Sequence, residues 1–306
     1  MNANACIAIA IFALSFVFPD LKVFYTLQYK HNNLYTMGPL DILIAIYFTN
    51  FWLLVRSLFM TIKFNIGNKE QRFKEQLYQA IMYIVTFSYG MFNYLQSDYK
   101  NDWMKMVQDY PHALVTKHVK LYFMLILSMW IHMVFLLYLE KRRKDHNMML
   151  MHHFVTITLI TLSWFTSMTK IGLLIEVVFD STDILLCVAK CVKYTKRHVL
   201  ADLIFGAFVL NWVYTRQYLF GNIIWILLQF PKFNDLKWDP SNGYFFDSTF
   251  YYSSIILLCT LFLLAMLWFA MIIKLVFKVL HGNNVEDSRS DDEEEETGGG
   301  DDKKHK

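Results

Sequence analysis

Long apolar segments dominate this sequence. A membrane-spanning helix needs about 20 mostly apolar residues, and we predict spans over 40–62, 77–95, 118–139, 148–168, 171–189, 199–220 and 250–273. A further apolar run over 6–18 is shorter and ends at Pro19, so a tilted span and an interfacial segment both stay open for it. Backbone polar groups in lipid must be satisfied within each segment, which makes these spans helical. The sequence therefore predicts an all-α polytopic membrane protein with seven core transmembrane helices and an extra N-terminal hydrophobic segment.

The chain divides into three predicted regions. Residues 1–39 hold the N-terminal hydrophobic segment and a loop, and residues 40–281 hold the transmembrane domain. From Asn283 onward the chain has ten acidic residues, four Lys or Arg, and no residues that could form a core. Such a composition is typical of a disordered segment, so residues 282–306 are predicted to be a disordered acidic tail.

Positive charge indicates the orientation in the membrane. Loops 63–74, 140–147 and 190–197 carry four Lys or Arg each, whereas loops 96–116 and 230–248 carry two each. Basic loops face the cytosol, so these three loops and the C-terminus are predicted to be cytosolic. Lys303 and Lys304 fit a dilysine retrieval signal read from the cytosol. The sequence thus predicts a multi-pass protein of the endoplasmic reticulum membrane.

Histidines and acids are expected at matched depth on two neighbouring spans. His152 and His153 lie about 6–9 Å inside the cytosolic face, since a helix rises about 1.5 Å per residue. Counted back from the cytosolic loop, Asp183 and Asp180 lie roughly 10 and 15 Å inside the same face. The short connection over 167–171 favours an antiparallel pair of helices, which would bring the two sets together.

Two further polar residues belong to this pattern. Glu176 extends the face of Asp180 at helical spacing, and His132 lies about 12 Å inside the cytosolic face on its own span. A single histidine in a span can simply form an interhelical hydrogen bond, but polar groups in membranes are costly and tend to be functional. A histidine paired with a carboxylate can act as a base or carry a transferred group. A zinc ion held by His152 and an aspartate is a less favoured alternative.

The segments 141–164 and 168–194 resemble the Lag1 motif of ceramide synthases, within the TRAM–LAG–CLN8 family of TLC-domain proteins. The matching residues are Arg143, Lys144, Asp145, the adjacent histidines, Asp180, Asp183, Lys190 and Tyr194. The resemblance spans about residues 40–296, and the lack of a homeobox-like segment resembles a fungal or minimal member. It implies a TLC-type catalytic domain in an enzyme that transfers a fatty acyl group from acyl-CoA to a sphingoid base, sphinganine or phytosphingosine. The products would be a ceramide or dihydroceramide and CoA.

The resemblance also implies residue roles. His152 and His153 fall on the catalytic pair, with His152 accepting the acyl group as an acyl-imidazole, and Asp180 and Asp183 fall on the paired acids. Candidate substrate-binding residues are Arg143, Lys144, His132, Lys190, Tyr194 and Arg56. No metal or resident cofactor is expected, because acyl-CoA is a co-substrate.

The sequence departs from the family pattern beside these motifs. Phe179 and Cys187 stand where animal members often have His and Glu, Trp130–His132 replaces a W-x-Q-like stretch, and Glu176 replaces an apolar residue. We expect these changes to affect substrate choice more than reaction type. Arg56 and Arg216 each lie within spans, and snorkelling to the interface is the expectation for both. Contact with coenzyme A phosphates is an alternative for Arg56, and pairing with another buried group is an alternative for Arg216.

Other functions and partners remain open at this stage. A non-catalytic TLC-domain protein in translocation or lipid sensing is the alternative, although such relatives usually have incomplete histidine and acid motifs. A transporter or receptor would give no reason for adjacent histidines. Expected partners are acyl-CoA, a sphingoid base and membrane lipid, without nucleic acid. A homodimer, a heterodimer with another ceramide synthase, and a small accessory subunit are all compatible with the sequence.

Overall fold

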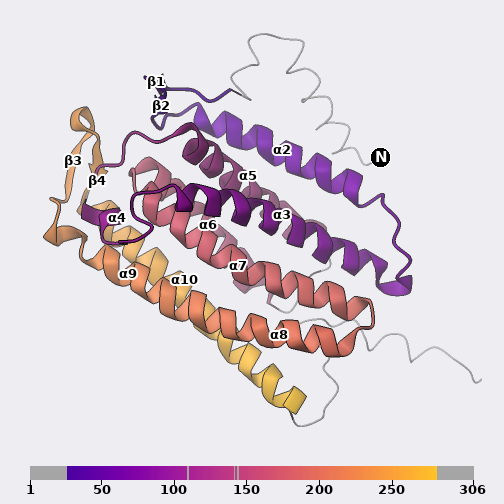
Figure 1. Ribbon diagram of the computed structural model, residues 1–306. Helices are drawn as coiled ribbons and strands as arrows, with labels where there is room; N and C mark the ends of the chain where they lie inside the picture. The colour runs from indigo at the N-terminus through magenta and orange to yellow at the C-terminus, as the bar shows by residue number, and fades with distance from the viewer. Residues whose placement is uncertain (1–25, 109, 141, 143–144, 281–306) are drawn as a thin grey trace, which may run out of the picture.

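A computed structural model describes residues 26–108, 110–140, 142 and 145–280, with side chains up to residue 277 (Figure 1). The predicted N-terminal segment 6–18, the tail 282–306, Arg143 and Lys144 lie outside the described residues. Within the described part, long helices form a bundle, so the all-α prediction is confirmed.

Each predicted span corresponds to a long helix. The helices are α2 (Asp41–Phe59), α3 (Glu70–Leu95), α5 (Lys117–Leu139), α6 (His146–Phe165), α7 (Thr169–Tyr194), α8 (His198–Trp212) with its continuation α9 (Phe220–Leu228), and α10 (Ser248–Leu280). Short elements connect them: β1 (Lys30–His31), β2 (Leu34–Tyr35), η2 (Gly67–Lys69), α4 (Lys105–Gln108), η4 (Phe230–Lys232), β3 (Lys237–Asp239), η5 (Pro240–Asn242) and β4 (Tyr244–Phe246). Strands β1 and β2 pair antiparallel, as do β3 and β4.

Several helices extend beyond the predicted spans. Helix α3 begins at Glu70 rather than 77, because the polar stretch before residue 77 continues the helix beyond its apolar part. The sixth span does not end at 220. It passes through a π-helical segment, η3 (Val213–Leu219), and continues as α9 because residues 223–228 are apolar.

Five helices are long and apolar enough to cross a membrane, over Asp41–Phe59, Lys117–Leu139, His146–Phe165, His198–Lys232 and Ser248–Phe277. Helices α3 and α7 are 26 residues each but are less apolar than these five. The class of polytopic helical membrane protein is therefore established on five spans among the described residues.

Helix α7 occupies the centre of the bundle. It packs along α3 and α8 and also contacts α6 (Figure 1). The contact with α3 is close at Gly90, where an added Cβ would lie 2.6 Å from Cγ2 of Val177 and 2.7 Å from the hydroxyl of Tyr122. A helix that is covered on several sides can carry polar residues without exposing them to lipid.

The two ends of the bundle differ. The connections from α2 to α3 and from α7 to α8 lie at one end, and the β-hairpins and α4 lie at the other (Figure 1). The first end carries the basic loops 63–74 and 190–197. At the second end a buried ion pair joins Lys120 to Asp41, with 2.7 Å between Nζ and Oδ1. Lys120 also donates to the carbonyls of Gln28 and Thr36, so it ties the N-terminal hairpin to α5.

Replacing Asp41 with asparagine is expected to destabilise the protein by about 3–5 kcal/mol, because it leaves the Lys120 ammonium buried without a counter-charge. The introduced amide would still accept from the indole of Trp164, as the Asp41 carboxylate does at 3.1 Å. The matched control is Asp98→Asn, since Asp98 pairs with Lys170 while 56% of its side chain is exposed, and we expect it to cost about 1 kcal/mol or less. Thermal unfolding in detergent measures both, and equal midpoints would contradict the assignment.

Candidate active site

A cavity of about 160 Å³ lies inside the bundle, and six helices and η3 contribute to its wall. Both members of the predicted histidine pair line it, together with Asp183 and Lys190. Its remaining polar lining includes residues near the basic loops, Glu140, Asp145 and His146 among them. The cavity therefore extends from the basic end of the bundle to the histidines.

Indole rings hold the two histidines. Both are buried, His152 at 5% and His153 at 2% exposure. The ring of Trp130 meets both edge-on, with centroids 5.3 Å from His152 and 5.4 Å from His153, and Trp268 meets His152 at 5.2 Å. Adjacent helical residues differ by about 100° in direction, yet both imidazoles line one cavity, and their ring centroids are 5.6 Å apart.

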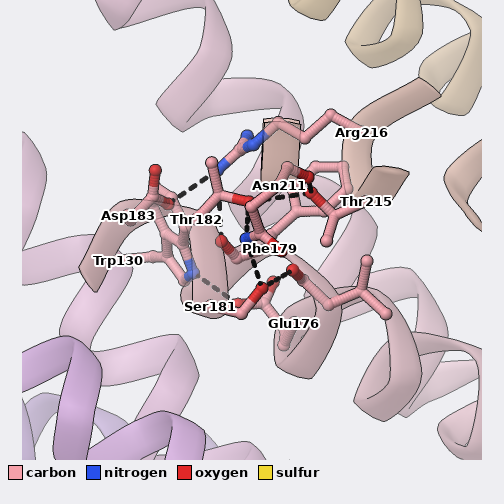
Figure 2. A network of polar contacts seen from close by, with 10 residues as sticks. Trp130, Glu176, Phe179, Ser181, Thr182, Asp183, Asn211, Thr215 and Arg216 are labelled. Atoms are coloured by element: carbon pink, nitrogen blue, oxygen red, sulfur yellow. Dashed lines mark hydrogen bonds and ion pairs between the residues drawn. The ribbon is translucent and has the colours of Figure 1, made fainter. Parts of the chain in front are cut away.

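Asp183 forms a buried ion pair with Arg216. Their Oδ2 and Nη2 atoms are 2.7 Å apart, and Arg216 also donates to the carbonyl of Phe179 (Figure 2). The guanidinium lies over the rings of Phe179 and Trp212, at 4.2 and 4.8 Å from their centroids. Such stacking suits the planar guanidinium. The site thus presents a fixed positive charge beside the histidines.

Arg216 lies in the π-helical segment η3, and π-bulges are frequent at functional sites. Polar contacts attach this region to α7: Thr215 and Thr182 share a hydrogen bond of 2.8 Å, and Asn211 donates to Ser181 and Thr182 (Figure 2). These bonds fix the angular position of η3 relative to α7, which directs Arg216 towards Asp183.

The three acids of α7 do not share one environment. Asp183 lines the cavity, whereas Asp180 is buried at 1% exposure and does not. Asp180 lies beside Thr86 of α3 and Tyr122 of α5. Glu176 accepts a hydrogen bond of 3.0 Å from Nε1 of Trp130 (Figure 2). The acids therefore connect α7 to three different partners.

At the mouth of the cavity, Arg56 and Glu140 form an ion pair with 3.5 Å between Nη2 and Oε1. Arg56 does not itself line the cavity, but its partner does. The pairing keeps the guanidinium beside Glu140, which lines the cavity.

Two of the predicted substrate-binding residues lie outside the cavity, whereas Lys190 lines it. His132 is buried outside the cavity, 3.1 Å from the hydroxyl of Tyr78. Tyr194 ends α7 and does not line the cavity either. Among the residues that the structure describes, no group of three or more His, Cys, Asp or Glu could hold a metal ion.

Sequence reasoning missed the role of Arg216. For Arg216 the snorkelling expectation is wrong, because the side chain is 4% exposed and ion-paired, whereas the alternative of pairing with a buried group is confirmed. Arginine side chains on a helix point towards its N-terminus, which for this span is the basic end of the bundle. The available signal was an arginine within an apolar span beside a helix with three acids.

Comparison with known proteins places these observations in a family. The TLC domain matches residues 72–274. Sphingosine N-acyltransferase lag1 of Schizosaccharomyces pombe is 34% identical over 288 residues, which cover 89% of this chain and 73% of that protein. Sphingosine N-acyltransferase lac1 of the same yeast is 31% identical over 273 residues, covering 84% and 70%. Ceramide synthase hyl-2 of Caenorhabditis elegans is 27% identical over 231 residues, covering 72% and 68%.

The fold and the cavity define a class, a polytopic helical membrane protein with a buried histidine–carboxylate site. Within that class, the chain belongs to the TLC-domain family. The resemblance to Lag1-type ceramide synthases that the motifs indicate is confirmed by these relatives, several of them fungal.

Proposed function

We propose that this protein is a ceramide synthase that transfers a fatty acyl group from acyl-CoA to the amine of a sphingoid base. The observation that carries the proposal is the cavity that joins His152, His153 and the Asp183–Arg216 pair inside a TLC-type bundle. Its basic-end opening suits a water-soluble CoA group, while its apolar wall suits a hydrocarbon chain.

The proposed chemistry has two balanced steps. In the first, an imidazole nitrogen of His152 attacks the thioester carbonyl, the carbon–sulfur bond breaks, and CoA leaves as the thiol with the proton that the His152 ring loses. In the second, the sphingoid amine attacks the acyl-imidazole, the amide forms, and His152 leaves as neutral imidazole. His153 accepts the proton that the amine loses and passes it to the departing His152 ring, so that both rings end neutral. Arg216 stabilises negative charge on the acyl oxygen.

The proposed site needs no resident cofactor or metal, since the thioester already activates the acyl group. We also infer that α3 and α7 cross the membrane, which gives seven core spans. At about 1.5 Å per residue each is about 39 Å long, enough for a hydrocarbon core of about 30 Å. Helix α7 can be less apolar than the other spans because it turns its polar residues towards its neighbours.

The basic-loop count supports an orientation with the cavity mouth and the C-terminus in the cytosol. Lys303 and Lys304, at the positions of a dilysine signal, support a place in the endoplasmic reticulum membrane. Acyl-CoA would then enter from the cytosol and the sphingoid base from the bilayer. Dimers and a small accessory subunit remain compatible with this arrangement.

The test of the proposal is an assay of the purified wild-type protein in detergent or vesicles with acyl-CoA and sphinganine. We expect equal amounts of dihydroceramide and free CoA, measured by mass spectrometry and by thiol titration. A folded, monodisperse protein that forms no N-acyl product would refute the proposal.

Replacing Arg56 with glutamine is expected to raise KM for acyl-CoA several-fold with little change in kcat, because the lost charge lies at the mouth and not at the histidines. KM for sphinganine should stay the same. Lys63→Gln, in a loop at the same end of the bundle, is the control for a general loss of positive charge. An unchanged KM for acyl-CoA in the Arg56 variant would remove Arg56 from the binding site.

A further inference from the structure

A second cavity of about 50 Å³ lies deeper in the bundle, between α6, α7, α9 and α10. Three of these helices also wall the catalytic cavity. On α6, Thr156 of the second cavity follows His152 by one turn, and on α7 Glu176 precedes Asp183 by two turns. The second cavity therefore continues the first along the helix axes, about 6–10 Å farther from the basic end.

One hydrogen bond marks the boundary between the cavities. Trp130 lines only the catalytic cavity and Glu176 only the deeper one, and Nε1 of Trp130 donates to Oε2 of Glu176 at 3.0 Å (Figure 2). Both side chains are buried, with exposures of 4% and 5%. Because the same indole contacts both histidines, the boundary lies directly beyond the reacting groups.

The wall of the deeper cavity suits a hydrocarbon chain. Most of it is apolar, from residues such as Leu159, Ile171, Leu258 and Leu261. Each methylene group that enters an apolar site favours binding about fourfold. An acyl chain that starts at His152 and runs away from the cavity mouth would gain this contribution only after passing the Glu176–Trp130 pair.

We propose that the Glu176–Trp130 pair limits the depth to which the acyl chain enters, so that Glu176 restricts the acyl-chain length of the product. This inference rests on the proposed function, because it assumes an acyl chain bound near His152. It gives a role to a carboxylate that the acyl-transfer chemistry does not use. It also gives a reason for a buried acid beside a mostly apolar cavity.

The test compares Glu176→Ala with Glu176→Gln in a competition assay over saturated acyl-CoAs that differ by two carbons. Alanine removes the barrier, so the relative kcat/KM of the acyl-CoA two carbons longer than the wild-type optimum should rise about tenfold. Glutamine can still accept from Trp130 and should keep the wild-type profile. If the alanine variant does not fold, Trp130→Phe tests the same hydrogen bond, with a smaller shift in the same direction.

A filling substitution makes the test sharper. Ser254 lines the deeper cavity, so Ser254→Leu should reverse the shift in the Glu176→Ala background and leave the profile of the otherwise wild-type enzyme unchanged. Three outcomes would overturn the inference: an active Glu176→Ala enzyme with the wild-type profile, shorter products from Ser254→Leu alone, or a shift in the preferred sphingoid base length instead. A wild-type protein without N-acyl product would overturn the proposed function as well, whereas these three leave it intact.

Discussion

Replacing His152 with alanine is expected to lower the rate of ceramide formation by at least about a thousandfold, because it removes the group that carries the acyl chain. His153→Ala should lower kcat by about 10²–10⁴-fold, as expected for loss of a general base. Trp130 contacts both residues. Each single variant keeps one of these two contacts and should therefore retain the fold. Rates are measured by product mass spectrometry with saturating acyl-CoA and sphinganine.

His118→Ala is the matched control, since His118 is exposed at the end of the bundle opposite the cavity mouth and contacts Tyr89. It should keep full activity. If His152→Ala retained full activity, the site assignment would fail. If His153→Ala abolished activity and His152→Ala did not, the acyl group would belong on His153.

Replacing Arg216 with methionine should both destabilise the protein and abolish activity. It leaves Asp183 buried without its counter-charge, and breaking a buried ion pair costs about 3–5 kcal/mol. The guanidinium also lines the same cavity as the two histidines. We expect a lower unfolding midpoint in detergent and a loss of kcat of about 100-fold or more.

A double variant separates these two effects. Arg216→Met combined with Asp183→Leu removes both charges, so stability should recover towards the wild-type value because no uncompensated charge remains. Activity should not recover, since the positive charge at the acyl oxygen is still missing. Recovered activity in the double variant would show that the pair acts only on folding.

Much of the fold could be predicted from the sequence because lipid allows few solutions. Long apolar runs have to be helices, and their ends were placed within a few residues wherever polar loops follow directly. The prediction failed where a helix does not end at the limit of its apolar residues. Helix α3 extends beyond its apolar residues, and the sixth span continues through the π-helical segment because the hydrogen-bond pattern changes without a polar break.

The candidate site was partly predictable for a similar reason. Depth along a helix is a matter of counting, so the shared cavity of His152, His153 and Asp183 follows from the sequence. The direction in which a side chain points around its helix cannot be obtained by such counting. Asp180 shares a predicted face with Asp183 but turns to Thr86, and His132 has a matching depth but faces Tyr78. The neighbour that each side chain meets depends on how the helices pack. Asp183, for example, meets Arg216, which lies 33 residues later in the chain.

The central claim is that His152 carries the acyl group within this cavity. Purified wild-type protein is mixed with acyl-CoA alone, quenched rapidly, digested and analysed by peptide mass spectrometry, and sphinganine is added to a second portion before quenching. We predict one acyl group on the peptide that contains His152, release of an equal amount of CoA, and loss of the label as dihydroceramide forms. Dihydroceramide formation without acylation of that peptide at any time point would contradict the account.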